Sequence, residues 1–174
     1  MMWLTRKEEG GGWSALVLTG AFFDIESLPG RMRAVLEDPD FSDRALRRLF
    51  PSTYRNDPAA EAECQRLLRD DLLRHKRECL AAFERTVQAG TEIQGSSGFS
   101  FLQMDLLDED LTLWLGFLHD LRIVIGTALD IRDDDWNERV TPDDPHYQEF
   151  ALLEGLAHLE QTILDALRTA EGFD

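Results

Sequence analysis

The stretch EDLTLWLGFLHDLRIVIGTAL, residues 109–129, decides the fold. Its length and its apolar residues on nearly every side predict a helix that other helices enclose. Asp108 stands where a residue would cap the first turn. Three ionisable side chains, His119, Asp120 and Arg122, interrupt the apolar run. They need an explanation, because a buried charge without a partner is costly.

Two further long helices are predicted, one on each side of this stretch. The first is expected at 58–89. It begins at Asp57-Pro58, a typical pair of N-cap and first-turn residues, and Gly90 ends the helix. Its apolar stripe repeats every three or four residues, and it consists of Cys64, Leu68, Leu72, His75, Cys79, Phe83 and Val87. The last helix is expected at 145–168, with a stripe of Leu152, Leu156, Leu159, Ile163 and Leu167.

Shorter elements complete the expected fold. Apolar or alternating runs predict strands near 14–19 and 99–104, and shorter helical patterns occupy 31–38 and 41–50. Residues 1–12 are predicted to be a flexible leader and 13–174 a single globular domain. The fold class is therefore mainly α: a helical bundle around a buried central helix, with a small β-sheet as a minor component.

The charge of the chain is strongly acidic and unevenly divided. The net charge is −16, and residues 1–90 carry 14 basic and 15 acidic side chains, whereas residues 91–174 carry 4 and 19. Such a surface repels nucleic acid and anionic membranes, so direct binding of nucleic acid is not expected. No apolar run reaches the roughly 20 residues that span a membrane. Two cysteines do not make an extracellular disulfide scaffold, and we expect a cytoplasmic protein.

The polar residues of the central stretch are expected to form a structural network. His119 and Arg122 share a face of the predicted helix, and Asp120 lies on roughly the opposite side. A catalytic role for His119 is the alternative, but no Ser or Cys nucleophile stands beside it in the sequence. Candidate partners are Arg74 or Lys76 for Asp120, and Asp133 or Asp134 for Arg122.

Cys64 and Cys79 are candidate redox thiols. Fifteen residues of continuous helix would separate them by about 22 Å, whereas a disulfide needs α-carbons within about 7 Å. We therefore expect no bond between them inside one chain. They can be small apolar residues of the stripe, they can link two chains, or one can be a reactive thiol beside Arg or Lys.

Metal, cofactor and nucleic-acid sites have weak support. Glu154 and His158 are four residues apart on the last helix, but two ligands of this type are common by chance and we expect no metal. No glycine-rich phosphate motif follows a predicted strand, so no cofactor is expected. A basic face is conceivable on the helices of the first half, and it would consist of Arg44, Arg47, Arg48, Arg74, Lys76 and Arg77. Mixed charges of this kind more often form a solvated surface.

Two longer stretches resemble a known family. They are RLFPSTYRNDPAAEAECQRLLRDDLLRHK (48–76) and WLGFLHDLRIVIGTALDIRDDDW (114–136), with the patterns LFPxxY, DDLxxxK and DLRxxxGTxL. They are similar to an actinobacterial family classed as a domain of unknown function, which includes actinomycete oxidative-stress transcription regulators. Its members are often encoded beside the adaptor of the Clp protease. The likeness covers residues 13–170, nearly the whole chain.

The resemblance implies a cytoplasmic regulator with a redox-sensitive cysteine pair and a sigma-factor partner. The pair has CxxxC spacing in the family. Here the residue four positions after Cys64 is Leu68, and the residue four positions after Cys79 is Phe83, so neither cysteine has a partner at that spacing. The redox switch therefore does not carry over. We expect a non-enzymatic regulatory domain, a stress-linked transcription regulator acting through a protein partner such as a sigma factor or an RNA polymerase component. The alternatives are a proteolysis-associated adaptor and a small metal-dependent hydrolase. A homodimer is expected if the last helix exposes part of its stripe.

Overall fold

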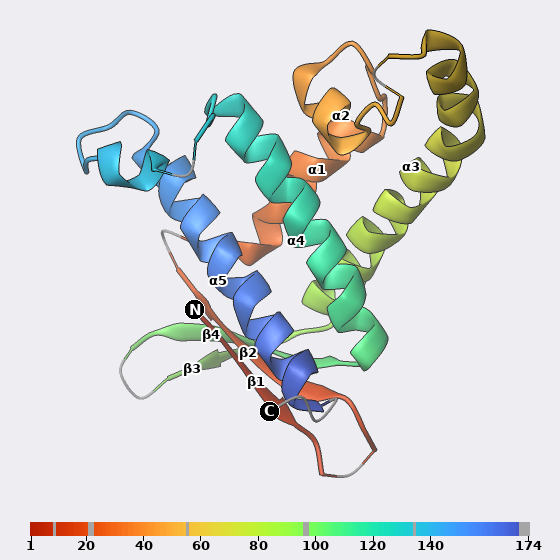
Figure 1. Cartoon of the computed structure of the whole chain (residues 1–174). Coiled ribbons are helices and arrows are strands. Elements are labelled where there is room, and N and C mark those ends of the chain that lie inside the picture. The colour runs from red at the N-terminus through yellow and green to blue at the C-terminus, as the bar shows by residue number, and fades with distance from the viewer. Residues whose placement is uncertain (9, 21–22, 55, 96–97, 134, 171–174) are drawn as a thin grey trace.

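The computed structural model describes the chain except for residues 9, 21–22, 55, 96–97, 134 and 171–174. The elements run in the order β1 (Met2–Arg6), β2 (Trp13–Thr19), η1 (Ile25–Ser27), α1 (Leu28–Leu36), α2 (Arg44–Leu49), α3 (Pro58–Gln88), β3 (Thr91–Gln94), β4 (Ser100–Leu106), α4 (Asp108–Ala128), η2 (Trp136–Arg139) and α5 (Tyr147–Ala170). Figure 1 shows the sheet lying across one end of the helices. The prediction of a mainly α chain with a small β-sheet is confirmed.

The four strands form one antiparallel sheet in the order β1-β2-β4-β3. The two strands predicted from the sequence, β2 and β4, pair directly, with Trp13 opposite Leu106. Residues 1–12 were expected to be a flexible leader, and here the structure corrects the prediction, because Met2–Arg6 pair with β2 as an edge strand. Gly12 lies in the loop between the two strands. Its φ is +80°, and a Cβ there would lie 2.5 Å from the Leu106 carbonyl oxygen, so only glycine fits without strain.

Helix α3 begins and ends as the sequence predicts. The Asp57 side chain accepts hydrogen bonds from the backbone N–H groups of Ala59 and Ala60, and Pro58 occupies the first turn. The C-terminal half of its apolar stripe is buried, including Cys79, Phe83 and Val87. The N-terminal half leans away from α4 (Figure 1), and its stripe remains exposed.

Helix α4 packs against α3, α5, α2 and α1. Its Leu111, Trp114 and Leu118 side chains are fully buried, and Phe117 stacks on Phe83 of α3 with ring centroids 4.1 Å apart. By length and composition, α4 alone among the described helices is long and apolar enough to cross a membrane. The core helix of a folded domain passes the same test, and the face that α4 buries against its neighbours fits that case.

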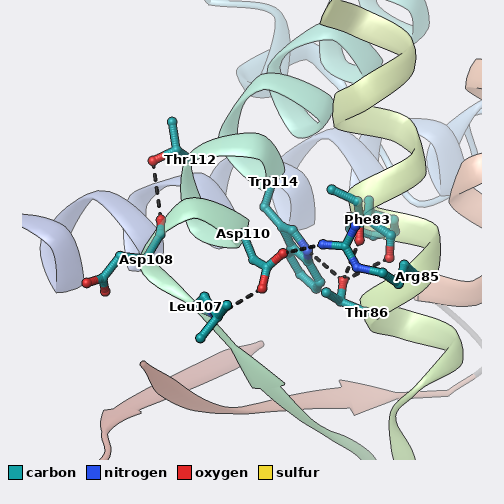
Figure 2. A network of polar contacts seen from close by, with 9 residues as sticks. Phe83, Arg85, Thr86, Leu107, Asp108, Asp110, Thr112 and Trp114 are labelled. Atoms are coloured by element: carbon teal, nitrogen blue, oxygen red, sulfur yellow. Dashed lines mark hydrogen bonds and ion pairs between the residues drawn. The ribbon is translucent and has the colours of Figure 1, made fainter. Parts of the chain in front are cut away.

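A polar network joins the start of α4 to the end of α3 (Figure 2). Asp108 was expected to cap α4, but the helix begins at this residue. Instead, the side chain of Asp110 accepts the backbone N–H of Leu107 at 2.9 Å and an Arg85 guanidinium N–H at 2.6 Å. The Trp114 indole N–H donates to the Thr86 hydroxyl at 2.9 Å. These bonds satisfy groups that the core would otherwise leave unpaired.

Helix α5 places its predicted stripe inside the fold. Leu156, Leu159 and Ile163 are fully buried, and the helix contacts α4 and β1. Leu152 is also buried, whereas Leu167 is only half-buried, so the homodimer expected from an exposed part of this stripe stays a prediction.

Candidate functional site

The three ionisable residues in the middle of α4, His119, Asp120 and Arg122, face different neighbours. Asp120 accepts a hydrogen bond from the Lys76 ammonium of α3 at 2.7 Å. Arg122 donates instead to Glu160 of α5. His119 is exposed and takes part in neither pair. The expected single network is thus two separate ion pairs that attach α4 to the helices on either side.

The Lys76–Asp120 pair is the more deeply enclosed of the two. The side chains are 14% and 8% exposed, and the Lys76 nitrogen also lies 5.6 Å from the centre of the Phe50 ring. Lys76 was one of the two partners predicted for Asp120, and the prediction is confirmed. Two charges taken out of water need this geometry, because each one alone would carry a large desolvation cost.

The partner of Arg122 corrects the sequence prediction. Asp133 was expected, but it accepts from Arg139 at 2.6 Å, and the other candidate, Asp134, lies outside the described residues. Arg122 points toward α5 because α5 packs against α4 and brings the half-buried Glu160 carboxylate within ion-pair distance. Arg122 Nε and Glu160 Oε1 are both buried and find no hydrogen-bond partner among the described residues, so the pair uses only part of its capacity.

His119 lines a cleft between α4, α5 and the segment that joins them. The cleft has a volume of about 470 Å³ and is open on one side. Arg122 and Arg48 of α2 also line it, together with the Trp136 indole of η2. The lining contains no Ser or Cys and no carboxylate, so among the described residues His119 has no nucleophile or acid beside it in this cleft.

The two thiols lie in different environments on one continuous helix, and both are free. Cys79 is buried against α4, where a Cβ built on Gly116 would come within 2.8 Å of its sulfur. Burial, with the nearby Asp120 carboxylate, raises the pKa of the Cys79 thiol to about 11, so it is protonated at neutral pH and a poor nucleophile. Cys64 is half-buried, with its sulfur 3.8 Å from the Thr53 hydroxyl, and it remains the candidate for thiol chemistry.

The predicted basic face is not one surface. Lys76 is buried against Asp120, and Arg77 donates to the backbone carbonyl of Leu36 at 2.6 Å. Arg74 pairs with Asp71 and Glu78 on its own helix, and Arg44 pairs with Asp130 at 2.5 Å. Arg47 and Arg48 are exposed on α2, and only Arg48 lines the cleft. The cations of the first half are thus largely used to hold the fold together.

The acidic residues of the second half give no metal centre. Among the described residues, no group of three or more His, Cys, Asp or Glu side chains is arranged to hold a metal ion. Glu154 and His158, the weak metal candidates, are both exposed on α5. Asp130, at the end of α4, accepts from Arg132 and Arg44, and these bonds hold the pKa of its carboxyl below the usual value.

An exposed apolar surface on α3 is a feature that the sequence did not predict. Leu67, Leu68 and Leu72 are 55%, 50% and 43% exposed. We call these three residues the α3 patch. Leu68 and Leu72 belong to the apolar stripe that the sequence predicts. The periodicity of the stripe does not indicate how far along α3 the neighbouring helix α4 covers it.

Comparison with known proteins identifies a family for this chain. Searches of curated proteins and of solved structures found no significant match. A family model matches residues 12–167, most of the chain. The chain therefore belongs to the family described as a domain of unknown function, DUF2017.

Proposed function

We propose that this protein is a non-enzymatic regulatory domain that binds a helix of a partner protein on the α3 patch. The observation that carries the proposal is the exposure of Leu67, Leu68 and Leu72 within two turns of the half of α3 that leans away from α4. Of these, Leu68 and Leu72 are four residues apart and share a face of the helix. Contiguous apolar side chains that water contacts are characteristic of interaction surfaces, whereas single exposed leucines are not.

The position of the patch indicates what would bind there. Leu68 and Leu72 continue the same face of α3 that buries Cys79 and Phe83 against α4. Beyond that contact α4 leaves α3, as Figure 1 shows, and the stripe has no cover. An amphipathic helix from a partner, carrying leucine-like residues at three- and four-residue spacing, would extend the helix–helix packing that the chain already makes.

The class of partner comes from the resemblance to actinomycete oxidative-stress regulators. It suggests a cytoplasmic, stress-linked transcription regulator that acts through a sigma factor or another RNA polymerase component. The net charge of −16 supports a protein partner over direct contact with DNA, since an acidic surface repels phosphates. The actinobacterial origin and the link to the Clp adaptor rest on the resemblance alone.

The test begins by identifying the partner at the patch. A photo-crosslinking amino acid at position 68 should capture an RNA polymerase component in cells, and the same group at Leu164, an exposed leucine of α5, should not. The purified partner is then titrated against the wild-type chain and the Leu68→Ser/Leu72→Ser variant. We expect the variant to bind at least about tenfold more weakly, because each leucine that is buried contributes roughly 1.5–3 kcal/mol.

Three outcomes would count against the proposal. Equal affinity of the variant and the wild type would exclude the patch as the binding surface. Capture of a Clp subunit would support the proteolysis-associated adaptor in place of the transcription regulator. Capture of a second copy of the chain would mean that the patch is a dimer interface. The Leu164→Ser variant serves as the control for the general effect of removing an exposed leucine.

A further inference from the structure

We infer that the cleft beside His119 binds a small organic carboxylate with a flat apolar body, a ligand site separate from the α3 patch. The volume of about 470 Å³ lies within the range of small-molecule sites. The described lining combines polar and apolar side chains. The polar side chains are Arg48, His119 and Arg122, and the apolar ones include Ile123, Trp136 and Leu153.

The cationic part of the cleft is unusual for this half of the chain. From residue 91 onward the chain carries only four basic side chains against 19 acidic ones. Arg132 and Arg139 each pair with an acid close by in sequence, Asp130 and Asp133. Arg122 reaches the cleft, where α2 adds a second guanidinium from Arg48. Two arginines at one site in an otherwise acidic region favour an anionic ligand.

Both guanidinium groups retain hydrogen-bonding capacity. Arg48 makes only a long contact, 3.4 Å, to the Thr127 hydroxyl, and no carboxylate lies within ion-pair distance of it among the described residues. Arg122 donates to Glu160 through Nη1 and its Nε is buried, so its Nη2, which makes no hydrogen bond among the described residues, is the nitrogen that a ligand in the cleft would meet. Arginine presents a planar fork that matches a carboxylate, so these two residues could hold one from two sides.

The apolar part sets the shape of the ligand. The Trp136 indole is stacked on the Phe150 ring, with centroids 5.3 Å apart and planes 20° from parallel, which holds the indole in one orientation. Ile123 and Leu153 supply aliphatic contacts from α4 and α5. A ring or a branched chain packs well on such surfaces. The lining lacks a nucleophile, so the site is suited to binding rather than to turnover.

The test compares two probes of similar shape, a carboxylate anion and a neutral amide in which an NH2 group replaces one acceptor oxygen. Isothermal titration calorimetry is run with 1-naphthoate and with its neutral amide, 1-naphthamide. We expect one site for the naphthoate and at least about tenfold weaker binding of the amide, because a charge-assisted hydrogen bond is roughly twice as strong as a neutral one.

Variants then locate the site. Arg48→Gln should weaken naphthoate binding about tenfold to a hundredfold. Arg47→Gln, on the same helix but outside the cleft, should leave it within roughly twofold, since it removes only a distant screened charge. Arg122→Lys keeps a positive charge beside Glu160 but loses the planar pair of N–H donors that matches a carboxylate. It should also weaken naphthoate binding, and circular dichroism should show an unchanged fold.

The inference fails if the amide binds as tightly as the acid, or if Arg47→Gln and Arg48→Gln have equal effects. It also fails if naphthoate shows no binding at concentrations up to about 5 mM, where even a weak specific site would be occupied. None of these experiments involves the α3 patch, so either proposal can fail while the other stands.

Discussion

Asp120→Ala removes one partner of an ion pair that α3 and α4 enclose between them. The remaining Lys76 ammonium, whose side chain is 14% exposed, would then be held among apolar groups without a counter-charge. Breaking a buried pair in this way typically costs about 3–5 kcal/mol. For a chain of this size, 1 kcal/mol shifts the melting temperature by about 2–4 °C, so we expect a decrease of roughly 6–20 °C.

Urea denaturation followed by circular dichroism measures the free energy of unfolding of each variant. Asp71→Ala is the matched control, because Asp71 pairs with Arg74 where both side chains are more than 60% exposed. Such a surface pair contributes about 0–1 kcal/mol, so the control should remain close to the wild type. The double variant Lys76→Met/Asp120→Leu removes both charges and should recover most of the lost stability.

The reasoning is refuted if Asp120→Ala loses less than about 1 kcal/mol, the value of an exposed pair. It is also refuted if the double variant is less stable than Asp120→Ala alone. In that case the Lys76 ammonium left alone would not be destabilising, contrary to the expectation for an enclosed charge without a partner.

Four further predictions concern the close packing of Gly116, the two thiols and the loop between β1 and β2. Gly116→Ala should cost about 1–3 kcal/mol by overpacking against the Cys79 sulfur, and adding Cys79→Ala should make the alanine neutral or favourable; thermal melting of the single and double variants measures both. Because the pKa of Cys79 is raised to about 11 in the folded state, the thiol of the unfolded chain ionises first, and the free energy of unfolding should fall by about 2–3 kcal/mol as pH rises from about 9 to 11. A plot of the free energy of unfolding against pH, measured by chemical denaturation, should be flatter for Cys79→Ala. At neutral pH, a thiol-specific disulfide reagent should therefore modify Cys64 in the native protein and Cys79 only after unfolding, a result that mass spectrometry can distinguish. Gly12→Ala should destabilise the β1–β2 hairpin by about 1–3 kcal/mol, more than Gly10→Ala, which shares the positive φ but faces open space; chemical denaturation compares the two.

Much of the secondary structure follows from local rules. The Asp57-Pro58 start of α3 was predictable, since a short acidic side chain accepts the first free N–H groups of a helix, and Asp43 caps α2 in the same way. Strand β1 was missed, although the three glycines before Trp13 are a turn signal of the kind that joins hairpin strands. Its side chains, three apolar ones followed by Thr5 and Arg6, do not alternate, and only pairing with β2 reveals it as an edge strand.

The candidate sites were less predictable than the helices. The partner of Asp120 could be named because a buried carboxylate needs a cation and α3 offers one at the right height. The partner of Arg122 was wrong because the nearest acids in sequence were chosen, whereas the ion pair forms with α5, the helix that packs beside it. The residues that line the cleft come from α2, α4, η2 and α5. Periodicity within one segment does not indicate that side chains from four segments lie around the same cleft.

The order of residues along the chain by itself determined where α3 begins and ends, that the 109–129 stretch is apolar on nearly all sides, and that Cys64 and Cys79 stand too far apart on one helix to bond. Periodicity and capping are local, so they can be read from neighbouring residues. The tertiary structure decided which half of the α3 stripe is covered, which helix neutralises Arg122, and that Arg48 faces the same cleft as His119. These depend on the angles and positions at which helices cross, and crossing is set by packing between segments that lie far apart in the chain.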